Sequence, residues 1–552
     1  MNAAALGPLV KAVETLKVFA RSAPAPSTLL ANRRQRFDRL HAIVPSTATP
    51  GESCQLTVQA WDQCERLHGS FTGTATVAAT DPDATHPDRV AFADADGGVV
   101  RETVQFDTPG THYLTLTVDG ERFVSNPVRV APEHDTWTYW GDIHLHSTLS
   151  DGSGHAEAGY RFGRDVMDLD VVAYTDHDTM GFFIPPGWQR RRMHDGYFEA
   201  LCDLAASFDD EGEFVTLPAY EWTKQPNMGG HLNVYFEDEA DATLIDSLWE
   251  ESRTYEDLWA RLREWDDAHD SRVVTIPHHP AEAMYPFDFA SVDYDDDLAP
   301  LVEVYSQWGS SERPGREGNQ FPLAMGQGEI DEPGHYVQDA HELGYRVGML
   351  GGADFHGPNP GHSTIHAEPH FPALGEWRDA GLGWGNIWRV WDEQSYPGGL
   401  TAFRAPELTR EAIFTALRSR SVYATTQPHR ILVDFRVNGI GVADQEDEIS
   451  VDDPTSPRTV SVDVAGTAPI DTVEVVKNNA VWRTVEGTSD PDAALDTYTV
   501  TDEWTDEEPI AGMEWDETRG TDGDVYTLRV TQASADRHPG MAWVGPLWVV
   551  AA

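Results

Sequence analysis

Apolar residues occupy every second position in the first part of the chain. The alternation runs from Cys54 to Ala60 and again from Leu114 to Val118, and the turn residues Pro109 and Gly110 precede the second run. A period of two is typical of strands with one buried face, and turns between such runs indicate antiparallel strands. The pattern predicts a small β-sandwich-like domain over residues 40–132.

The pattern changes at about residue 138, where short apolar stretches begin to alternate with helical ones. We expect helices at 156–167 and 255–269, strands at 141–146 and 169–174, and further strands that end at 220–221, 276–278, 302–305 and 348–352. A strand followed by a helix, repeated along the chain, is typical of a parallel sheet, and at this length an α/β barrel is favoured over an open sheet. Reactive residues in such barrels lie at the C-terminal ends of the strands.

The period of two returns in the last part of the chain. A helix is expected at 410–418, after which apolar residues alternate from Ile431 to Val437 and again from Val525 to Val530. This pattern predicts a second all-β, sandwich-like domain over residues 430–552. The barrel is then expected to span residues 133–429.

The N-terminal stretch has a different composition. Residues 1–20 have the spacing of a short amphipathic helix, and residues 22–27 are rich in proline, so we expect residues 1–39 to form a helix and a linker. Lys11, Glu14 and Lys17 interrupt the apolar positions, unlike a signal peptide. No run approaches the 18 apolar residues of a membrane span.

Charge narrows the range of partners. The chain has 39 Lys and Arg against 92 Asp and Glu, a formal net charge of −53, and the acidic residues are spread through all regions. Such a surface repels nucleic-acid duplexes and anionic membranes. The composition resembles that of halophilic proteins. These proteins work in molar salt, which shortens the Debye length to about 3 Å and screens the repulsion between their own charges. An ordinary acidic protein is the alternative.

The three cysteines, Cys54, Cys64 and Cys202, are too few for a disulfide framework in a chain of 552 residues. They are expected to be small buried residues, although Cys54 and Cys64 could pair across strands. A reducing compartment, and hence a cytoplasmic protein, is predicted.

A candidate for chemistry follows the first strand of the barrel region. His144 and His146 are two residues apart, so on a strand both side chains would project from one face. Asp151 follows at a turn between Ser150 and Gly152, where its carboxylate can turn back toward the same point. The three side chains make up half of a metal coordination shell.

Later strands in this region also end in an imidazole or a carboxylate. With the first three residues they give nine candidate metal ligands: His144, His146, Asp151, His177, Glu221, His231, His278, Asp354 and His356. Imidazole and carboxylate suit the divalent ions of hydrolytic centres, and carboxylates can bridge two ions. Nine donors fit two or three ions, and ions about 3.5 to 4 Å apart can share one hydroxide that attacks phosphorus.

In order along the chain, these motifs resemble those of the PHP (polymerase and histidinol phosphatase) superfamily of metal-dependent phosphoesterases. The wording around Glu303–Ser306, Gly309–Glu312 and Tyr423–Thr426 is similar to a PHP-related family known only as a domain of unknown function. The resemblance implies an α/β fold with a distorted seven-stranded (β/α) PHP-type barrel, flanked here by the N- and C-terminal all-β domains. It also implies zinc, manganese or iron as the metal and a small anionic, phosphorylated substrate.

Several neighbours of these ligands have secondary candidate roles. His279 is the alternative to His278, because the two form a doublet at one strand end. Asp142 and Asp176 lie beside ligands and are expected to accept a ring N–H and fix the tautomer. Glu303, also at a strand end, is a further polar candidate.

Three residues are candidates for catalysis itself. Asp354 is expected to act from within the cluster, and His362, just beyond it in the sequence, is a candidate acid for the leaving group. Arg161, on the expected helix at 156–167, could attract an anionic group, although arginines on helices are more often solvated.

The reading favoured by the sequence is a metal-dependent hydrolase of phosphoesters. The first alternative is an amidohydrolase-type hydrolase of C–N or C–O bonds, which also begins with His-x-His on its first strand. Asp176 followed by His177, and Asp354-x-His356, fit the phosphoesterase pattern better. The second alternative is a catalytically silent, metal-containing protein whose β-domains bind a carbohydrate or a protein partner.

Overall fold

The computed structural model describes residues 9, 10, 12, 13, 16, 17, 20, 23–364, 366–372, 374–390, 395–444, 448–535 and 537–551. Much of the helix expected over residues 1–20 therefore lies outside the described residues. A short helix, α2 (Pro26–Ala31), precedes the first strand.

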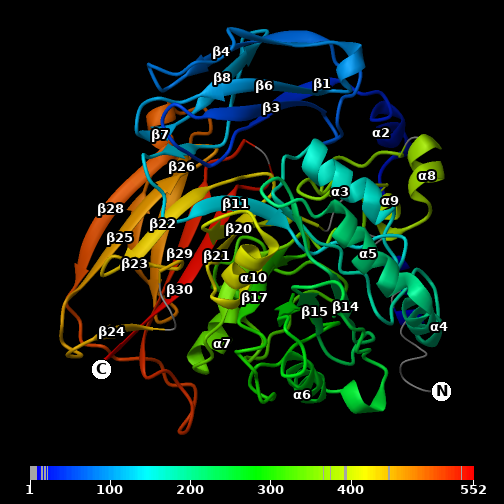
Figure 1. Cartoon of the computed structure of the whole chain (residues 1–552), viewed down its shortest axis with the longest axis vertical. Helices are drawn as coiled ribbons and strands as arrows, with labels where there is room; N and C mark the ends of the chain where they lie inside the picture. The colour runs from blue at the N-terminus through cyan, green and yellow to red at the C-terminus, as the bar shows by residue number, and fades with distance from the viewer. Residues whose placement is uncertain are drawn as a thin grey trace.

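The N-terminal β region, at the top of Figure 1, consists of three small sheets with the orders β1-β3-β6, β2-β10-β7 and β5-β4-β8-β9. Its strands are β1 (Phe37–Ile43), β2 (Thr47–Ala48), β3 (Ser53–Asp62), β4 (Gly73–Ala79), β5 (Arg89–Phe92), β6 (Val99–Gln105), β7 (Gly110–His112), β8 (Leu114–Val118), β9 (Glu121–Val124) and β10 (Val128–Val130). Leu56, Val58 and Leu116 belong to one buried core, as the period of two predicts. Cys54 and Cys64 are buried and unbridged.

The central region contains the parallel strands that the alternating pattern predicts. The first group is β11 (Trp137–Asp142), β12 (Val171–Val172) and β13 (Val215–Thr216), which pair in parallel. The second sheet has the order β14-β15-β16-β17-β18, with β19 beside β17. Its strands are β14 (Ala219–Trp222), β15 (His231–Phe236), β16 (Val273–His278), β17 (Leu301–Ser306), β18 (Gly309–Ser310) and β19 (Gly348–Gly351).

Helices cover the central region, mainly on the right-hand side of Figure 1. They are α3 (Ala156–Asp165), α4 (Pro186–Arg192), α5 (Phe198–Phe208), α6 (Tyr255–Asp266), α7 (Val337–Glu342), α8 (Leu374–Ala380), α9 (Trp384–Trp388) and α10 (Arg410–Arg418). The hydroxyl of Thr254 accepts a hydrogen bond from the Asp257 backbone N–H and caps α6. The bounds expected for α10 are confirmed, whereas α3 and α6 each end before the predicted residue.

The central region also contains antiparallel pairs that a simple strand–helix repeat does not predict. β14 pairs antiparallel with β15, and β15 with β16, while β16, β17 and β19 pair in parallel. The strands β20 (Gly399–Ala405) and β21 (Val422–Thr426) add antiparallel partners beside β11. The fold is therefore mixed α/β with all-β regions, and the seven-stranded barrel stays a prediction.

The C-terminal β region, on the left of Figure 1, joins the central sheet directly. β21 pairs antiparallel with β30 (Met541–Ala551), so one sheet runs from β13 through β21 and β30 to β27. A second sheet has the order β23-β22-β25-β28. The remaining strands are β22 (Leu432–Val437), β23 (Ile440–Gly441), β24 (Ile449–Val451), β25 (Arg458–Ala465), β26 (Ile470–Lys477), β27 (Ala480–Glu486), β28 (Thr499–Asp506) and β29 (Gly523–Gln532).

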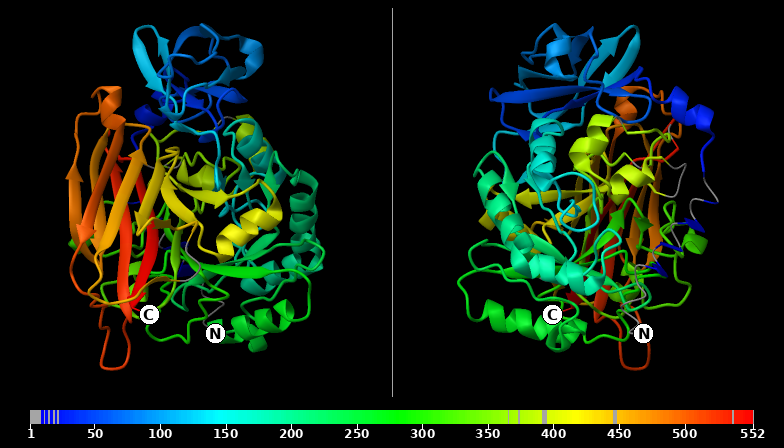
Figure 2. Two further views of the ribbon diagram at one scale, coloured as in Figure 1. Left: turned by 60° about the vertical axis from the view of Figure 1, so that its left-hand side comes forward. Right: turned by 90° about the vertical axis from the view of Figure 1, so that its right-hand side faces the viewer.

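The three regions are tied together by buried polar contacts as well as by the shared sheet. Arg529 of β29 pairs with Glu312 of the central region, and the Trp543 indole N–H donates to the same carboxylate at 2.9 Å. The Trp140 indole N–H donates to the Ser46 hydroxyl at 2.8 Å. The two views of Figure 2 show the N-terminal β region resting on one end of the other two regions.

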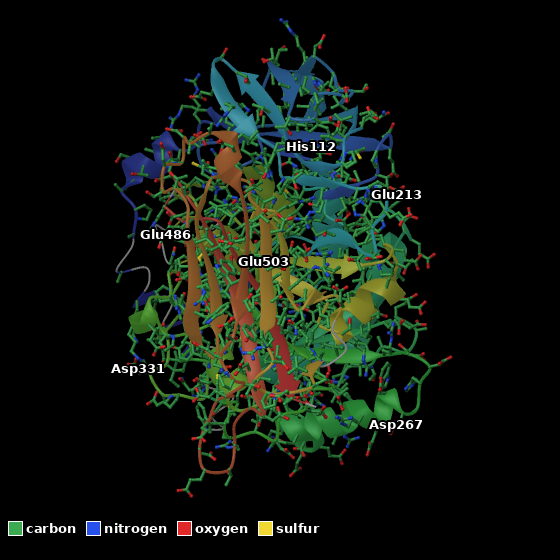
Figure 3. All side chains as sticks on the ribbon, turned by 90° about the vertical axis from the view of Figure 1, so that its left-hand side faces the viewer. His112, Glu213, Asp267, Asp331, Glu486 and Glu503 are labelled. Carbon is green, nitrogen blue, oxygen red and sulfur yellow. The ribbon has the colours of Figure 1, made fainter. Side chains whose placement is uncertain are left out.

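Acidic side chains are distributed over the surface rather than gathered in one patch. In Figure 3 the exposed Glu213, Asp267, Asp331, Glu486 and Glu503 lie on different parts of the molecule. No helix in the described part of the chain has the length and apolar character needed to cross a membrane.

Candidate metal centre

The first two histidines follow β11 rather than lying within it. The regular strand ends at Asp142, so the expected strand at 141–146 is shorter than predicted. Leu145 forms a parallel bridge with Phe355, and the backbone N–H of His146 donates to the Phe355 carbonyl at 3.0 Å. This pairing places the segment of Asp354 and His356 directly beside that of His144 and His146.

The turn that carries Asp151 is held by Asp176. Its carboxylate accepts hydrogen bonds from the backbone N–H groups of Ser147 and Ser150, at 2.9 and 3.0 Å, and from both serine hydroxyls, at 2.7 and 2.5 Å. A Cβ at Gly152 would lie 2.1 Å from the His146 carbonyl oxygen, so the closure of the turn requires glycine there. Asp176 thus fixes the turn. Among the described residues it accepts no hydrogen bond from a histidine ring, which was its expected role.

Strand register aligns a second set of donors. His231 of β15 stands opposite His278 of β16, and His278 stands opposite Glu303 of β17. On the neighbouring strand, Glu221 forms a parallel bridge with His177. Side chains at matched positions of adjacent strands share one face. The ends of β14, β15, β16 and β17 therefore place these groups close together.

The donors form three buried groups in which the ligand atoms lie within 4.8 Å of one another. The groups are His146, Asp151, His177 and His356; His144, His146, Glu221 and Asp354; and His231, His278 and His279. All nine predicted ligands are therefore brought together in adjoining groups. The third group contains both histidines of the doublet, so sequence order alone does not separate His278 from His279.

Glu221 links the groups. Its Oε2 lies 3.4 Å from His144 Nε2 and 3.1 Å from His146 Nε2. Its Oε1 lies 3.1 Å from His177 Nδ1, 2.6 Å from His231 Nδ1 and 3.5 Å from His278 Nε2. Each carboxylate oxygen thus faces a different set of imidazoles, which is the arrangement of a bridging carboxylate.

The other two carboxylates link imidazoles in the same way. Asp354 Oδ1 lies 3.5 Å from His144 Nε2 and 3.1 Å from His146 Nε2. Asp151 Oδ1 lies 3.4 Å from His177 Nε2 and 3.3 Å from His356 Nε2. These separations match the spacing of about 3.4 Å between neighbouring ligands of a tetrahedral zinc ion.

Surrounding groups fix the orientation of the rings. Nδ1 of His144 lies 2.9 Å from Glu303 Oε2, and Nδ1 of His177 lies 2.8 Å from the Thr223 hydroxyl. Backbone carbonyls do the same for His231, at 2.9 Å from Lys224, and for His356, at 3.0 Å from Asp354. The hydrogen bond at one ring nitrogen leaves the other directed into the cluster.

The buried carboxylates of the cluster stabilise positive charge on the rings of His144 and His177. Burial alone would lower the pKa of the His144 ring, but Glu303 and Asp354 outweigh it and raise that pKa well above 6.5. The same balance raises the pKa of His177 to about 10, with Glu221 as its main opposing partner. Burial would raise the pKa of Glu221, yet His177, His278 and His231 hold it well below 4.5. Protons on the rings thus offset the buried carboxylates.

The residues fit divalent metal ions. Nε2 of His146, His177 and His278 lies 3.1, 3.4 and 3.5 Å from a carboxylate oxygen but without good hydrogen-bond geometry, and Nδ1 of His146 and of His278 is buried without a hydrogen bond to any described residue. Leaving such atoms unsatisfied is costly, and imidazole nitrogens beside carboxylate oxygens are the donors that zinc, manganese and iron accept. A bound ion would satisfy these nitrogens and replace the protons that the carboxylates now require.

Two of the predicted catalytic residues lie elsewhere. His362 stacks on Trp61 of the N-terminal β region, with ring centroids 3.9 Å apart, and its Nε2 lies 3.1 Å from Glu65. Arg161 is exposed on α3 and pairs with Glu157 at 2.8 Å. Asp354, the third candidate, is in the cluster. His362 packs against the N-terminal β region and Arg161 is solvated on a helix, so neither is in the cluster although both are close to ligands in the sequence.

One contact was not predicted from the sequence. The indole N–H of Trp308, two residues after β17, donates to Asp354 Oδ2 at 2.6 Å. The two residues are 46 positions apart, and no motif links them. Asp142 accepts hydrogen bonds from the backbone N–H groups of Ala353 and Gly361 and from the Gln427 side-chain amide. No ring donates to it in the described part of the chain, so its expected role was wrong.

A family model described as "Protein of unknown function (DUF3604)" matches residues 170–307 and 338–516. An uncharacterized protein of Chlamydia pneumoniae is 26% identical over 464 residues, which cover 83% of this chain. An uncharacterized protein of Chlamydia trachomatis is 25% identical over 461 residues, again 83% of this chain. The chain spans 65% of the length of each of these relatives.

Among solved structures, a two-domain protein from Bacteroides vulgatus, described as containing a predicted PHP-like metal-dependent phosphoesterase, is 16% identical. The match covers 76% of this chain and 97% of that one, with a TM-score of 0.33. At that score the likeness carries no argument about this chain.

Proposed function

We propose that this chain, which belongs to the family described as Protein of unknown function (DUF3604), is a metal-dependent hydrolase of phosphoesters. The proposal rests on the geometry of the site. The observation that carries the proposal is the position of Glu221, whose two oxygens face two different sets of imidazoles within 3.5 Å. A carboxylate so placed suits a centre with more than one ion.

We propose that two or three zinc, manganese or iron ions bind through the nine predicted ligands, with His279 as a further donor in the third group. Ions at such a centre supply a nucleophilic hydroxide at neutral pH and offset the charge that develops at phosphorus. This use of metal, and a barrel of PHP type around it, are the finer features that the sequence resemblance suggests.

Neighbouring residues of the chain hold the proposed ligands in the orientation that this chemistry needs. Glu303 and Thr223 hold the rings of His144 and His177, so their free nitrogens stay directed at the ions. Trp308 fixes one oxygen of Asp354 and leaves the other toward His144 and His146. The near-complete burial of the donors keeps bulk water from competing with a bound ester.

Phosphoesters are favoured over amides by charge. Two or three divalent ions outweigh the charges of Asp151, Glu221 and Asp354 and leave a positive site inside a strongly acidic protein. An anionic ester gains more from such a site than a neutral amide does. The amidohydrolase-type reaction and a silent metal-containing binding protein are the outcomes that compete with this proposal.

The test combines metal analysis with a substrate panel. Protein purified with all three metals should contain two or three ions per chain, and the double variant His144→Ala/His146→Ala should lose at least one. His269→Ala, a histidine that contacts Trp265 of α6, serves as the matched control. Phosphomonoesters, phosphodiesters and amides are then compared.

The expected result is phosphoester hydrolysis that chelation abolishes and added metal restores. Less than one ion per chain in the metal-replete wild type would contradict the metal centre. Hydrolysis of amides alone would favour the amidohydrolase-type alternative, and a full metal content without any hydrolysis would favour the binding protein.

A further inference from the structure

A series of aromatic rings runs outward from the metal centre. Trp308 is hydrogen-bonded to Asp354, and its ring centroid lies 4.8 Å from that of Trp388. The Trp388 ring also lies 5.1 Å from His356. The inner end of the series therefore contacts two of the proposed ligands.

The outer part of the series comes from α9 and a neighbouring turn. Trp384 and Trp388 are four residues apart on α9, so they share one face, and their rings stack at 5.3 Å with an interplanar angle of 15°. Phe183 continues the series at 5.4 Å from Trp384. We call Phe183, Trp384, Trp388 and Trp308 the aromatic wall.

Helix α9 is fixed closely to the backbone that carries the ligands. A Cβ at Gly383 would lie 2.1 Å from the Gly152 carbonyl oxygen, and one at Gly385 would lie 2.0 Å from the His356 carbonyl oxygen. The backbone N–H of Trp384 donates to the Asp151 carbonyl at 3.0 Å. Only glycine permits this approach, which sets the wall at a fixed position relative to the ligands.

The outer end of the wall is exposed in an unfavourable conformation. Phe183 is 55% exposed, and its φ of 52° lies in the left-handed region that bulky residues rarely adopt. It occupies the turn between Gly181 and Ile184, which form a bridge. A strained and exposed aromatic residue, at the outer end of a series of rings that reaches His356, indicates a surface kept for a ligand.

The other side of the cluster is apolar as well. The ring of Tyr285 lies 4.3 Å from His231, and it packs with Met180 and Met284 in a small buried group. In the described part of the chain, the ion-pair partners of Glu221, Glu303 and Asp354 are all histidines, so no guanidinium pairs with these three carboxylates. Buried apolar side chains rather than an arginine fork thus adjoin the cluster.

We propose that the aromatic wall binds a flat ring of the substrate, so that the phosphoester cleaved here carries an aryl group or a nucleobase. This inference rests on the proposed function, because the wall is placed by its contacts with proposed ligands. Trp384 and Trp308 are buried, at 2% and 5% exposed, so the ring stacks on the exposed Phe183 and the partly exposed Trp388, and its phosphoryl group then lies at the cluster.

The experiment compares two esters that differ only in the ring and adds a nucleoside ester. Wild-type kcat/KM is measured for benzyl methyl phosphate, cyclohexylmethyl methyl phosphate and a thymidine 5′-methyl phosphate diester. Phe183→Ala should lower the ratio of benzyl to cyclohexylmethyl kcat/KM by about tenfold, the scale of one lost stacking contact. Because the same two esters are compared in each variant, their intrinsic reactivities cancel.

Trp188→Ala is the matched control, since Trp188 is an exposed aromatic residue of α4, 61% exposed, outside the wall. Its benzyl to cyclohexylmethyl ratio should equal that of the wild type. An equal ratio in wild type and Phe183→Ala overturns the inference. The thymidine arm separates the sources, because a nucleobase preference appears as a higher kcat/KM for that diester than for the benzyl ester.

A binding measurement keeps the inference separate from the reaction. Benzylphosphonate, which has no ester bond to cleave, is titrated by calorimetry into metal-loaded wild type and variants, with methylphosphonate as the ring-free reference. Weaker binding of benzylphosphonate alone in Phe183→Ala supports the wall even if no ester is hydrolysed, an outcome that would overturn only the proposed function. Equal binding of the two phosphonates by the wild type overturns the wall.

Discussion

Nδ1 of His144 lies 2.9 Å from Oε2 of Glu303, a residue 159 positions away that stands opposite His278 in the strand register. The contact leaves Nε2 of His144 directed into the cluster, where it faces Glu221 and Asp354. Glu303 therefore acts through His144.

Replacing this carboxylate tests the assignment. Glu303→Gln should keep the fold but lower metal affinity about 10- to 100-fold, because a neutral amide holds the ring less firmly and makes it a weaker ligand. Affinity is measured by competition with a chelating dye. Glu317→Gln, an exposed glutamate in the short helix at 315–317, should bind metal like the wild type. An unaltered affinity in Glu303→Gln would remove this role.

A second prediction concerns Asp354, which faces His144 and His146 through one oxygen and Trp308 through the other. Asp354→Asn should lower kcat for the best phosphoester by at least roughly a hundredfold, the scale of an impaired charge-stabilising group. Circular dichroism checks the fold, and the exposed Asp331→Asn is the control. A folded Asp354→Asn protein with the wild-type rate would show that the activity arises at another site.

A third prediction concerns salt. With a formal charge of −53 spread over the surface, repulsion should destabilise the native state at low ionic strength and molar KCl should relieve it. We expect a higher Tm in molar KCl than in about 0.1 M KCl, measured by thermal unfolding. An unchanged or lower Tm at high salt would refute the halophilic interpretation.

A fourth prediction concerns acid. Burial lowers the pKa of His341, whose Nε2 lies 3.0 Å from the Val347 carbonyl oxygen, from 6.5 to about 4. At pH values between these two, the unfolded chain binds a proton here and the folded chain does not. The contribution of this histidine to stability is therefore complete above pH 6.5 and is lost progressively as the pH falls toward 4.

His341→Gln isolates this effect, because the amide can still donate to the carbonyl. Between pH 7.5 and 5, the wild type should lose about 2 kcal/mol more of its free energy of unfolding than the variant does. Urea unfolding of both proteins at each pH gives the comparison. Equal losses in the two proteins would contradict a neutral, buried His341.

Much of the candidate site was accessible from the sequence for a local reason. A strand that ends in an imidazole or carboxylate is visible as an apolar run followed by that residue, as at Tyr220 and Glu221 or at Pro277 and His278. The alternation of apolar residues likewise predicted the β regions, because the period of a strand is local. These features depend on neighbours in the chain.

Other features depend on pairing between distant strands and were decided by the tertiary structure. The sequence did not show that Glu221 lies between two sets of imidazoles, that Trp308 orients Asp354, or that His362 stacks on Trp61.

The sequence by itself determined which side chains were available and in what order, because residue type and local period are properties of the chain. The tertiary structure decided which of them share a space. Register and long-range packing bring Phe355 beside Leu145 and α9 against Gly152, and those contacts are set by the energy of the whole fold rather than by any one segment.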